Sequence, residues 1–159
     1  MTPTEIEAVE SALGERILSW RNLAGGYSHE TCALDLASGP AVVRLGGDSP
    51  AIEAAVMRRG REQVPVPRVR IVHESTDADV RSFMVIDHVD GHPLNEVLDA
   101  GEEPAAELYA LGGEVAGVAS RIGSINIASA PGFFADAELC VPPERAWSEQ
   151  LPEIATSCM

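Results

Sequence analysis

A glycine-rich turn, an arginine and a glutamate follow one another along the chain in an order that suits phosphate binding. The turn is Gly25-Gly26-Tyr27-Ser28, Arg44 ends a later apolar run, and Glu53 follows shortly after Arg44. Glycines let the backbone approach an anion closely, a guanidinium pairs with phosphate oxygens, and a carboxylate can hold that guanidinium in place. Together these residues predict a clamp for the phosphates of a nucleotide.

Each of these features also has a simpler explanation. Paired glycines between two strands commonly form an ordinary hairpin turn. An arginine at a strand end is often a solvated edge residue, and a glutamate in the first turn of a helix can simply complement the helix dipole. The support for a clamp therefore lies in the order of the features, which is turn, strand, strand with arginine, and helix with glutamate.

Strands and helices that would position this clamp are predicted from hydrophobic periodicity and turn residues. Thr2, Pro3 and Glu5 indicate a capped helix that ends at Gly14. A first strand is expected to begin at Ile17 and to lead into the glycine-rich turn. Four further strands are expected at 31–36, 41–45, 69–72 and 82–86, with an extended linker at 64–67. The helix that carries Glu53 is expected to start at a cap on Asp48 or Ser49 and to end near Gly60.

The second half of the chain is predicted to be largely helical. Helices are expected at 94–99, at 104–122 and from Pro142 onward. An apolar stripe on the helix at 104–122 is formed by Leu108, Leu111, Val115, Val118 and Ile122. The last helix is expected to have Trp147, Leu151 and Ile154 at its apolar positions. We expect Trp20 and Trp147 to be core residues.

The charge of the chain is unevenly distributed. Residues 1–81 contain nine Arg and twelve acidic residues, a net charge of −3, whereas residues 82–159 contain two Arg and thirteen acidic residues, a net charge of −11. The chain contains no lysine. A nucleic-acid partner is not expected, because phosphate backbones are bound by basic surfaces. The acidic second half could attract a cationic small molecule or could simply be a solvated surface.

The sequence shows no sign of export or of membrane insertion. No apolar run reaches the roughly 20 residues that span a bilayer, and the N-terminus lacks the basic start and apolar segment of a signal peptide. Cys32, Cys140 and Cys158 show neither disulfide nor metal-ligand spacing. We therefore expect a cytoplasmic location, reduced thiols and no membrane partner. The four histidines, which are His29, His73, His88 and His92, lack metal-site spacing and are expected to be ordinary surface groups.

Three stretches of the sequence resemble the N-terminal lobe of the aminoglycoside phosphotransferase family, which are protein-kinase-like enzymes that phosphorylate antibiotics and other small molecules. These stretches are LAGGYSHETCALDLASGPAVVRL, AIEAAVMRRGREQVPVPRV and SFMVIDHVDGHPL. Family members typically show a Gly-Gly-aromatic-Ser loop, a strand that ends in Lys or Arg, a helix Glu, a Val-Pro-x-Pro element, and an acidic hinge followed by Gly. The matching positions are Gly25 to Ser28, Arg44, Glu53, residues 64–67, and Asp87 to Gly91.

This resemblance implies an α+β fold. A kinase-like N-terminal lobe, with a five-stranded antiparallel sheet and one packed helix, would occupy residues 1–90. Residues 91–159 would form a linker and a helical appendage that resembles the beginning of the C-terminal lobe.

The resemblance also implies a site for ATP or GTP with Mg²⁺. Residues that would surround the phosphates are Gly25, Gly26, Tyr27, Ser28, Arg44 and Glu53. The base would contact main-chain groups of Asp87, His88 and Val89, and its apolar wall would include Val42 and Met84. Nucleotide binding is expected to be weak if the chain acts alone.

The catalytic part of the family pattern has no counterpart in this sequence. Neither the His-Gly-Asp context of the catalytic base nor the later magnesium-binding Asp is found, and Ile122-Gly123 stands where the family commonly has Leu-His. We therefore expect a nucleotide-binding lobe without its chemistry. A small hydroxylated or cationic substrate would bind only with a complete C-terminal lobe.

Three interpretations remain open at this stage. The first is the nucleotide-binding lobe of a small-molecule phosphotransferase, which would pair with a complementary chain. The second is a catalytically inactive, pseudokinase-like binding or dimerisation module, in which exposed helical stripes would favour a homodimer. The third is an unrelated α+β domain whose Gly-Gly turn is only a turn.

Overall fold

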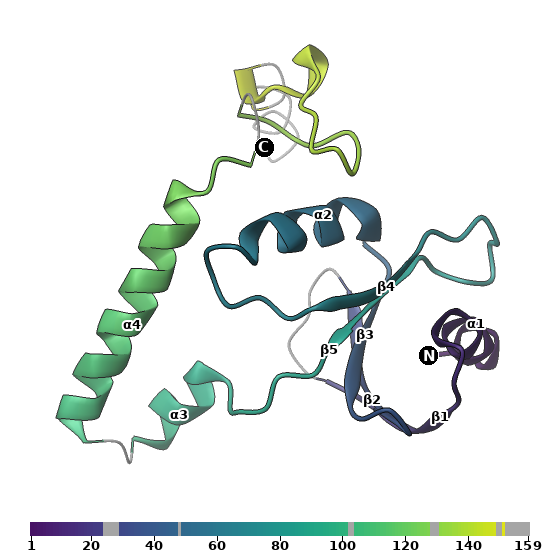
Figure 1. Cartoon of the computed structure of the whole chain (residues 1–159), viewed down its shortest axis with the longest axis horizontal. Coiled ribbons are helices and arrows are strands. Elements are labelled where there is room, and N and C mark those ends of the chain that lie inside the picture. The colour runs from purple at the N-terminus through teal and green to yellow at the C-terminus, as the bar shows by residue number, and fades with distance from the viewer. Residues whose placement is uncertain (24–28, 48, 102–103, 128–130, 149–150, 152–159) are drawn as a thin grey trace, which may run out of the picture.

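The computed structural model describes residues 1–23, 29–47, 49–101, 104–127, 131–148 and 151. Its elements are α1 (Pro3–Leu13), β1 (Ile17–Asn22), β2 (Glu30–Leu36), β3 (Ala41–Leu45), α2 (Pro50–Gly60), β4 (Val69–His73), β5 (Phe83–Asp87), α3 (Leu94–Ala100), α4 (Ala105–Ser124) and the 3₁₀ helix η1 (Pro143–Arg145). Figure 1 shows a sheet with two nearby helices, followed by an extended helical segment. The predicted α+β class is confirmed.

The five strands form one antiparallel sheet, as predicted. Their order across the sheet is β1-β2-β3-β5-β4, and every neighbouring pair is antiparallel. The first three strands pair in chain order as a meander, whereas the crossover through α2 places β4 at the far edge. The central strands β3 and β5 are the most buried, which explains why both are almost entirely apolar in sequence.

Side-chain alternation along the strands gives the sheet two different faces. One face packs against α1 and forms the hydrophobic core of the protein. Its buried members are Val9, Cys32, Leu34, Leu36, Ala41, Val43, Leu45, Val80, Phe83 and Val85. The alternate residues of β3, Val42 and Arg44, therefore lie on the opposite face, where α2 packs against the sheet.

Helix α1 begins and ends where the sequence predicts. The Thr2 side chain accepts a hydrogen bond from the Glu5 amide, Glu5 accepts one from the Thr2 amide, and Gly14 ends the helix in the left-handed conformation at φ 73°. This capping box satisfies two amides that would otherwise lack a partner at the helix start.

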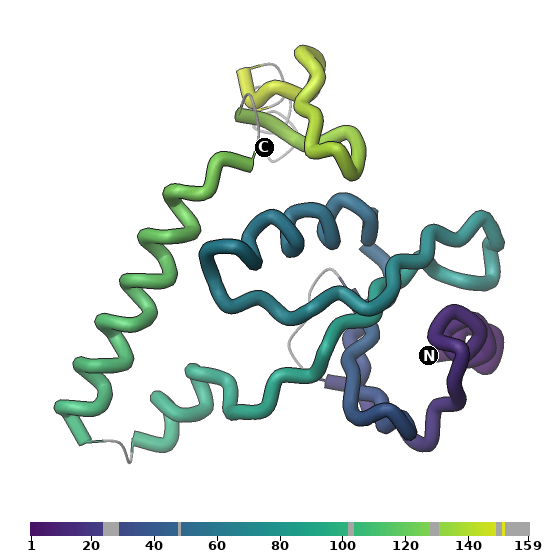
Figure 2. The backbone as a smooth tube through the Cα atoms, viewed as in Figure 1, coloured from purple at the N-terminus to yellow at the C-terminus, as the bar shows by residue number. Residues whose placement is uncertain are grey.

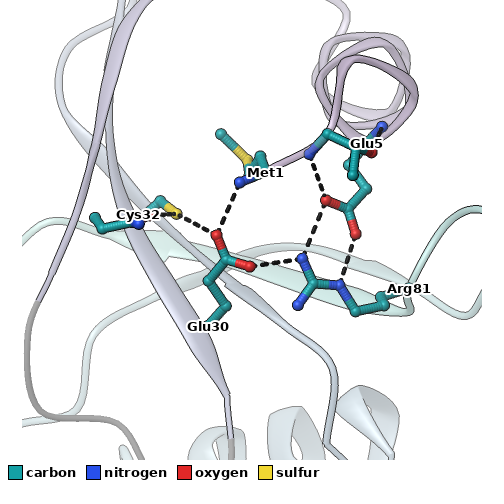
Figure 3. A network of polar contacts seen from close by, with 7 residues as sticks. Met1, Glu5, Glu30, Cys32 and Arg81 are labelled. Carbon is teal, nitrogen blue, oxygen red and sulfur yellow. Dashed lines mark hydrogen bonds and ion pairs between the residues drawn. The ribbon is translucent and has the colours of Figure 1, made fainter.

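A network of ion pairs fastens α1 to the sheet and to the loop before β5 (Figure 3). Arg81 donates to both carboxylate oxygens of Glu5, at 2.6 and 3.1 Å, and to Glu30 at 2.6 Å. The Met1 amine lies 2.8 Å from the other oxygen of Glu30. Glu5 is only 2% exposed, and its hydrogen bonds with Arg81 hold the pKa of its carboxyl below its ordinary value despite burial. A buried carboxylate is thus fully partnered, as its desolvation requires.

Helix α2 starts at Ser49, whose hydroxyl accepts a hydrogen bond from the Ile52 amide at 3.3 Å, and Pro50 follows in the first turn. This agrees with the cap predicted at this position, whereas Asp48, the other predicted cap, lies outside the described residues. Because Glu53 falls in the first turn of α2, the cap also fixes where that carboxylate stands.

The helical segment after β5 is much less buried. The chain leaves the sheet through 88–93 and continues into α3, which leads away from the sheet, and then into α4, which runs back toward the level of α2 (Figure 2). Within the described residues neither helix contains a buried residue. Near its end α4 approaches the turn after α2, where the Ser124 hydroxyl lies 3.4 Å from the Gln63 side-chain oxygen.

The helix predicted from Pro142 onward is wrong in its first part. In that part the chain forms only the short η1, because residues around it pair with an earlier segment instead, whereas Trp147, Ser148 and Leu151 are helical as predicted. The Phe133 amide donates to the Arg145 carbonyl at 2.9 Å, and the Trp147 amide donates to the Pro131 carbonyl at 3.2 Å. Trp147 is 49% exposed and Trp20 is 38% exposed, so neither is the core residue that the sequence suggested.

None of the helices among the described residues is long and apolar enough to cross a membrane.

Candidate nucleotide site

The structure brings Arg44 and Glu53 together. Arg44 lies near the end of β3, and its Nη1 donates to Oε1 of Glu53 in the first turn of α2. The Arg44 and Glu53 side chains are 27% and 28% exposed, so the pair is partly desolvated yet accessible. A guanidinium held by a carboxylate at one edge keeps other N–H groups available for an anion.

The register of the sheet places two further predicted residues on the same face as Arg44. Met84 is the cross-strand neighbour of Arg44, and Val42 lies two residues before Arg44 on β3. Met84 is 1% exposed and Val42 is 9% exposed. Val42 and Met84 thus form an apolar floor, and the Arg44 guanidinium lies directly beside it.

His29 also belongs to this cluster, although the sequence suggested an ordinary surface group. Its Nδ1 lies 3.2 Å from Arg44 Nη2, and its Nε2 lies 3.4 Å from Glu53 Oε2. The side chain is 18% exposed. Strand alternation could have indicated this position, because residues two apart on a strand lie on the same face. His29 lies two residues before Thr31, and Thr31 is the cross-strand neighbour of Arg44.

The predicted hinge residues differ in whether their backbone amides already donate a hydrogen bond. The Asp87 amide donates to the Arg68 carbonyl at 2.9 Å, so it is already occupied. The Asp87 carboxylate accepts hydrogen bonds from Arg70 at 2.6 Å and from Arg68 at 3.3 Å, and the Arg70 contact is the main reason that its pKa is lowered. Among the described residues no backbone carbonyl accepts a hydrogen bond from the His88 or Val89 amide.

An open hollow of about 230 Å³ lies beside this hinge. Ser19 and Arg21 of β1, Ala33 and Asp35 of β2, and His88 are among its lining residues. Ala33 is the cross-strand neighbour of Val42, so the hollow lies next to the apolar floor described above. His88 Nδ1 is buried at its margin and lies 3.2 Å from an oxygen of Asp90.

Some predicted residues cannot be placed. Gly25, Gly26, Tyr27 and Ser28 lie outside the described residues, and only their neighbour His29 is placed. Within the described part of the chain, no group of three or more His, Cys, Asp or Glu side chains is arranged to hold a metal ion.

One known protein family matches most of this chain. The sequence profile of the phosphotransferase enzyme family matches residues 19–153. The chain belongs to this family. No curated protein matches the chain.

Solved members with the same fold include the aminoglycoside phosphotransferase APH(4)-Ia, with a TM-score of 0.65 and 16% identity over 97% of this chain and 50% of that one. A thermostable mutant of the same enzyme in a ternary complex with ADP and hygromycin B gives a TM-score of 0.62 and 16% identity, covering 87% of this chain and 45% of that one. A further mutant with AMP-PNP and hygromycin B gives 0.61 and 18%, with the same coverage. This phosphotransferase-family chain thus spans about half the length of the solved relatives that it matches.

Proposed function

We propose that this chain is the nucleotide-binding lobe of a phosphotransferase that transfers the γ-phosphate of ATP or GTP to a hydroxyl group of a small molecule. The observation that carries this proposal is the Arg44–Glu53 ion pair on the sheet face that also presents Val42 and Met84. The solved relatives with ADP and with AMP-PNP support it at the level of the fold.

In this proposal the base of the nucleotide lies against Val42 and beside the hinge. The His88 and Val89 main chains supply polar contacts, because their amides have no backbone acceptor among the described residues. The glycine-rich stretch from Gly25 to Ser28 covers the phosphates. Magnesium, when it accompanies the nucleotide, supplies further neutralisation of the phosphate charge.

Arg44 takes the role of the phosphate-pairing cation. A guanidinium has five N–H donors and cannot lose its charge at physiological pH, so it can contact Glu53 and His29 and still offer donors to phosphate oxygens. Positioning and charge neutralisation are the main contributions of a protein to phosphoryl transfer. Arg44, which is held in place by Glu53 and His29, provides both positioning and positive charge.

A nucleotide titration of matched arginine variants tests the proposal. Arg44→Ala should weaken the binding of ATP with magnesium about 10- to 100-fold, which is the range for a lost charge-assisted hydrogen bond. Arg59→Ala removes the same charge from an exposed position of α2 and should stay within about twofold of the parent. Isothermal calorimetry gives the affinities. Absence of binding at millimolar ATP would overturn the proposal.

The acceptor substrate is the least defined part. Residues 82–159 carry a net charge of −11, which favours a cationic molecule with hydroxyl groups. We propose that a complete C-terminal lobe is needed to hold it, since the solved relatives are about twice as long as this chain.

A second candidate function is an interaction module, and the exposure of α4 favours it. Val115 is 46% exposed and Ile122 is 52% exposed, and both belong to the apolar stripe predicted on this helix. We propose that residues 1–90 act as the sheet lobe and that the stripe in the segment at 91–159 binds the remaining half of the fold seen in the longer relatives. A second acidic copy of this chain is less suited, because like charges repel.

Adding a polypeptide that corresponds to this remaining half tests the second candidate. The two chains should form a one-to-one complex in light scattering, and Val115→Asp should abolish it, whereas Glu114→Gln, on the neighbouring exposed position, should not. Failure to form a complex, or formation of a homodimer by the chain alone, would contradict the proposal that the remaining half of the fold binds the stripe on α4.

A further inference from the structure

His29 is held at both ends of its imidazole ring. Nδ1 faces Arg44 Nη2 at 3.2 Å, and Nε2 faces Glu53 Oε2 at 3.4 Å. Arg44 and Glu53 are themselves hydrogen-bonded. The three side chains, from β3, α2 and the residue before β2, therefore form a closed triangle in which each group contacts the other two.

The partners of His29 determine where its proton lies. Arg44 has only donors, so the Nδ1 that faces it must act as an acceptor and carry no proton. Glu53 has only acceptors when ionised, so the Nε2 that faces it must carry the proton. The geometry thus selects the neutral Nε2–H tautomer, which is complementary to both neighbours at once.

Gly47 provides the space for this ring. It has a left-handed φ of 88°, and a Cβ added to it would overlap His29 Nε2 and Cδ2. Gly46 has a similar φ of 81°, but its added Cβ would find only Arg81 Cδ, at 3.9 Å. Only the second of these adjacent glycines is therefore required for the His29 position, although both have backbone conformations that favour glycine.

We propose that His29 is a positioning residue for Arg44, whose neutral imidazole spans Arg44 and Glu53 and fixes the direction in which the guanidinium meets an anionic ligand. This inference rests on the proposed nucleotide function for its ligand. His29 acts through Arg44, because its two ring nitrogens are both occupied by the ion pair. The donors of Arg44 that neither neighbour uses are thereby aimed at the phosphates.

A double-mutant cycle separates positioning from direct contact. His29→Phe keeps an aromatic ring and removes both nitrogen contacts. It should weaken ATP binding about three- to tenfold, because the two lost contacts are long, at 3.2 and 3.4 Å, and act on the nucleotide only through Arg44. In the Arg44→Ala background the same change should have less than about a twofold effect, because the residue that it positions is gone. An equal loss in both backgrounds would overturn the proposal. His29→Gln, which keeps a donor and an acceptor, should recover part of the affinity.

The two adjacent glycines provide a second, independent perturbation that leaves His29 in place. Gly47→Ala should weaken ATP binding to about the same extent as His29→Phe, because the new methyl group displaces the ring. Gly46→Ala introduces comparable backbone strain without touching His29, so its affinity should stay within about twofold of the parent. Equal effects of both glycine changes on affinity would contradict the proposal.

Nitrogen-15 NMR of the histidine rings gives a readout that does not depend on nucleotide. The His29 signals, identified by their loss in His29→Phe, should show a neutral ring with the proton on Nε2 at the pH of the binding assay. The opposite tautomer, or a charged ring, would overturn the inference. If the parent chain binds no nucleotide, the proposed function fails. The contact of His29 with Arg44 and Glu53 is then still tested by the tautomer and by unfolding experiments. In these experiments the effects of His29→Phe and Arg44→Ala on the free energy of unfolding should be non-additive.

Discussion

The sheet lobe at residues 1–87 and the helical segment at 94–148 use similar apolar content in different ways. The sheet lobe has a core of completely buried side chains, with Phe83, Val43 and Val85 each 0% exposed. The helical segment has no buried residue in α3, α4 or η1, among the residues that the structure describes. Stability of the first region is therefore internal, whereas the apolar residues of the second remain available for contact with something else.

The two regions also differ in how charge is used. In the sheet lobe, Arg81 joins Glu5 and Glu30 across large distances in sequence, and Arg70 joins Asp87. In the helical segment the one described arginine contact with a backbone carbonyl is from Arg145 to Phe134 at 2.8 Å. Residues 82–159 contain two Arg against thirteen acidic residues, so most of the negative charge of this half is not compensated within it.

Matched removal of an aromatic side chain from each region should give the largest contrast. Phe83→Ala should lower the free energy of unfolding by about 3–5 kcal/mol, because it leaves a cavity in a close-packed core. Tyr109→Ala, on α4, should change it by less than about 0.5 kcal/mol, since Tyr109 is 89% exposed. Urea denaturation followed by circular dichroism measures both. Similar losses would mean that the two regions share one cooperative core.

Removal of Arg81 should give the next largest effect and test the charge contrast. Arg81→Ala leaves the buried Glu5 carboxylate without its main partner and should destabilise the chain by about 3 kcal/mol, at the low end for a buried pair because Arg81 itself is 43% exposed. The control is Arg16→Ala, which removes an arginine that is 90% exposed and lies 4.0 Å from Glu10. It should change stability by less than about 0.5 kcal/mol. Equal effects of the two changes would show that the network in Figure 3 contributes no specific stability.

Acid should produce a smaller and more gradual loss through the same network. The Met1 amine and Arg81 lower the pKa of Glu30 from 4.5 to about 2, and Arg81 also lowers the pKa of Glu5. Unfolding returns both carboxyls to ordinary values and so takes up protons. The free energy of unfolding should therefore be fully maintained above pH 4.5 and fall as the pH drops towards about 2.

Urea titrations at several pH values in this window measure the slope. Arg81→Ala should show a shallower slope than the parent, because Glu5 loses the main cause of its lowered pKa and Glu30 keeps only the Met1 amine as a partner that lowers its pKa. Parallel curves for the two proteins would contradict the role given to Arg81.

Much of the sheet lobe could be predicted from local sequence signals. The capping box at Thr2 and Glu5, the stop at Gly14 and the apolar run at 83–86 all act over a few residues, so the chain shows them directly. The pairing of Arg44 with Glu53 was also predictable, because a strand end followed closely by a capped helix restricts where the two side chains can lie.

Features that depend on distant partners were not predictable. The η1 segment fails to become the expected helix because its backbone pairs with Pro131 and Phe133, and no local pattern indicates that pairing. His29 was assigned to the surface since its type is common there, whereas its two partners lie on other elements. Exposure of Trp147 likewise depends on which elements surround it, not on its hydrophobicity.

The use of arginine at the end of β3 has a practical consequence for labelling experiments. Because the sequence contains no lysine, acylating nucleotide analogues that mark the phosphate-pairing amine of kinases have no side-chain target here, and amine-directed cross-linkers cannot join its side chains to a neighbour. Dicarbonyl reagents, which condense with guanidinium groups, are the suitable probes for Arg44. Chemical surveys that detect nucleotide sites through a reactive lysine therefore cannot test the proposed role of Arg44.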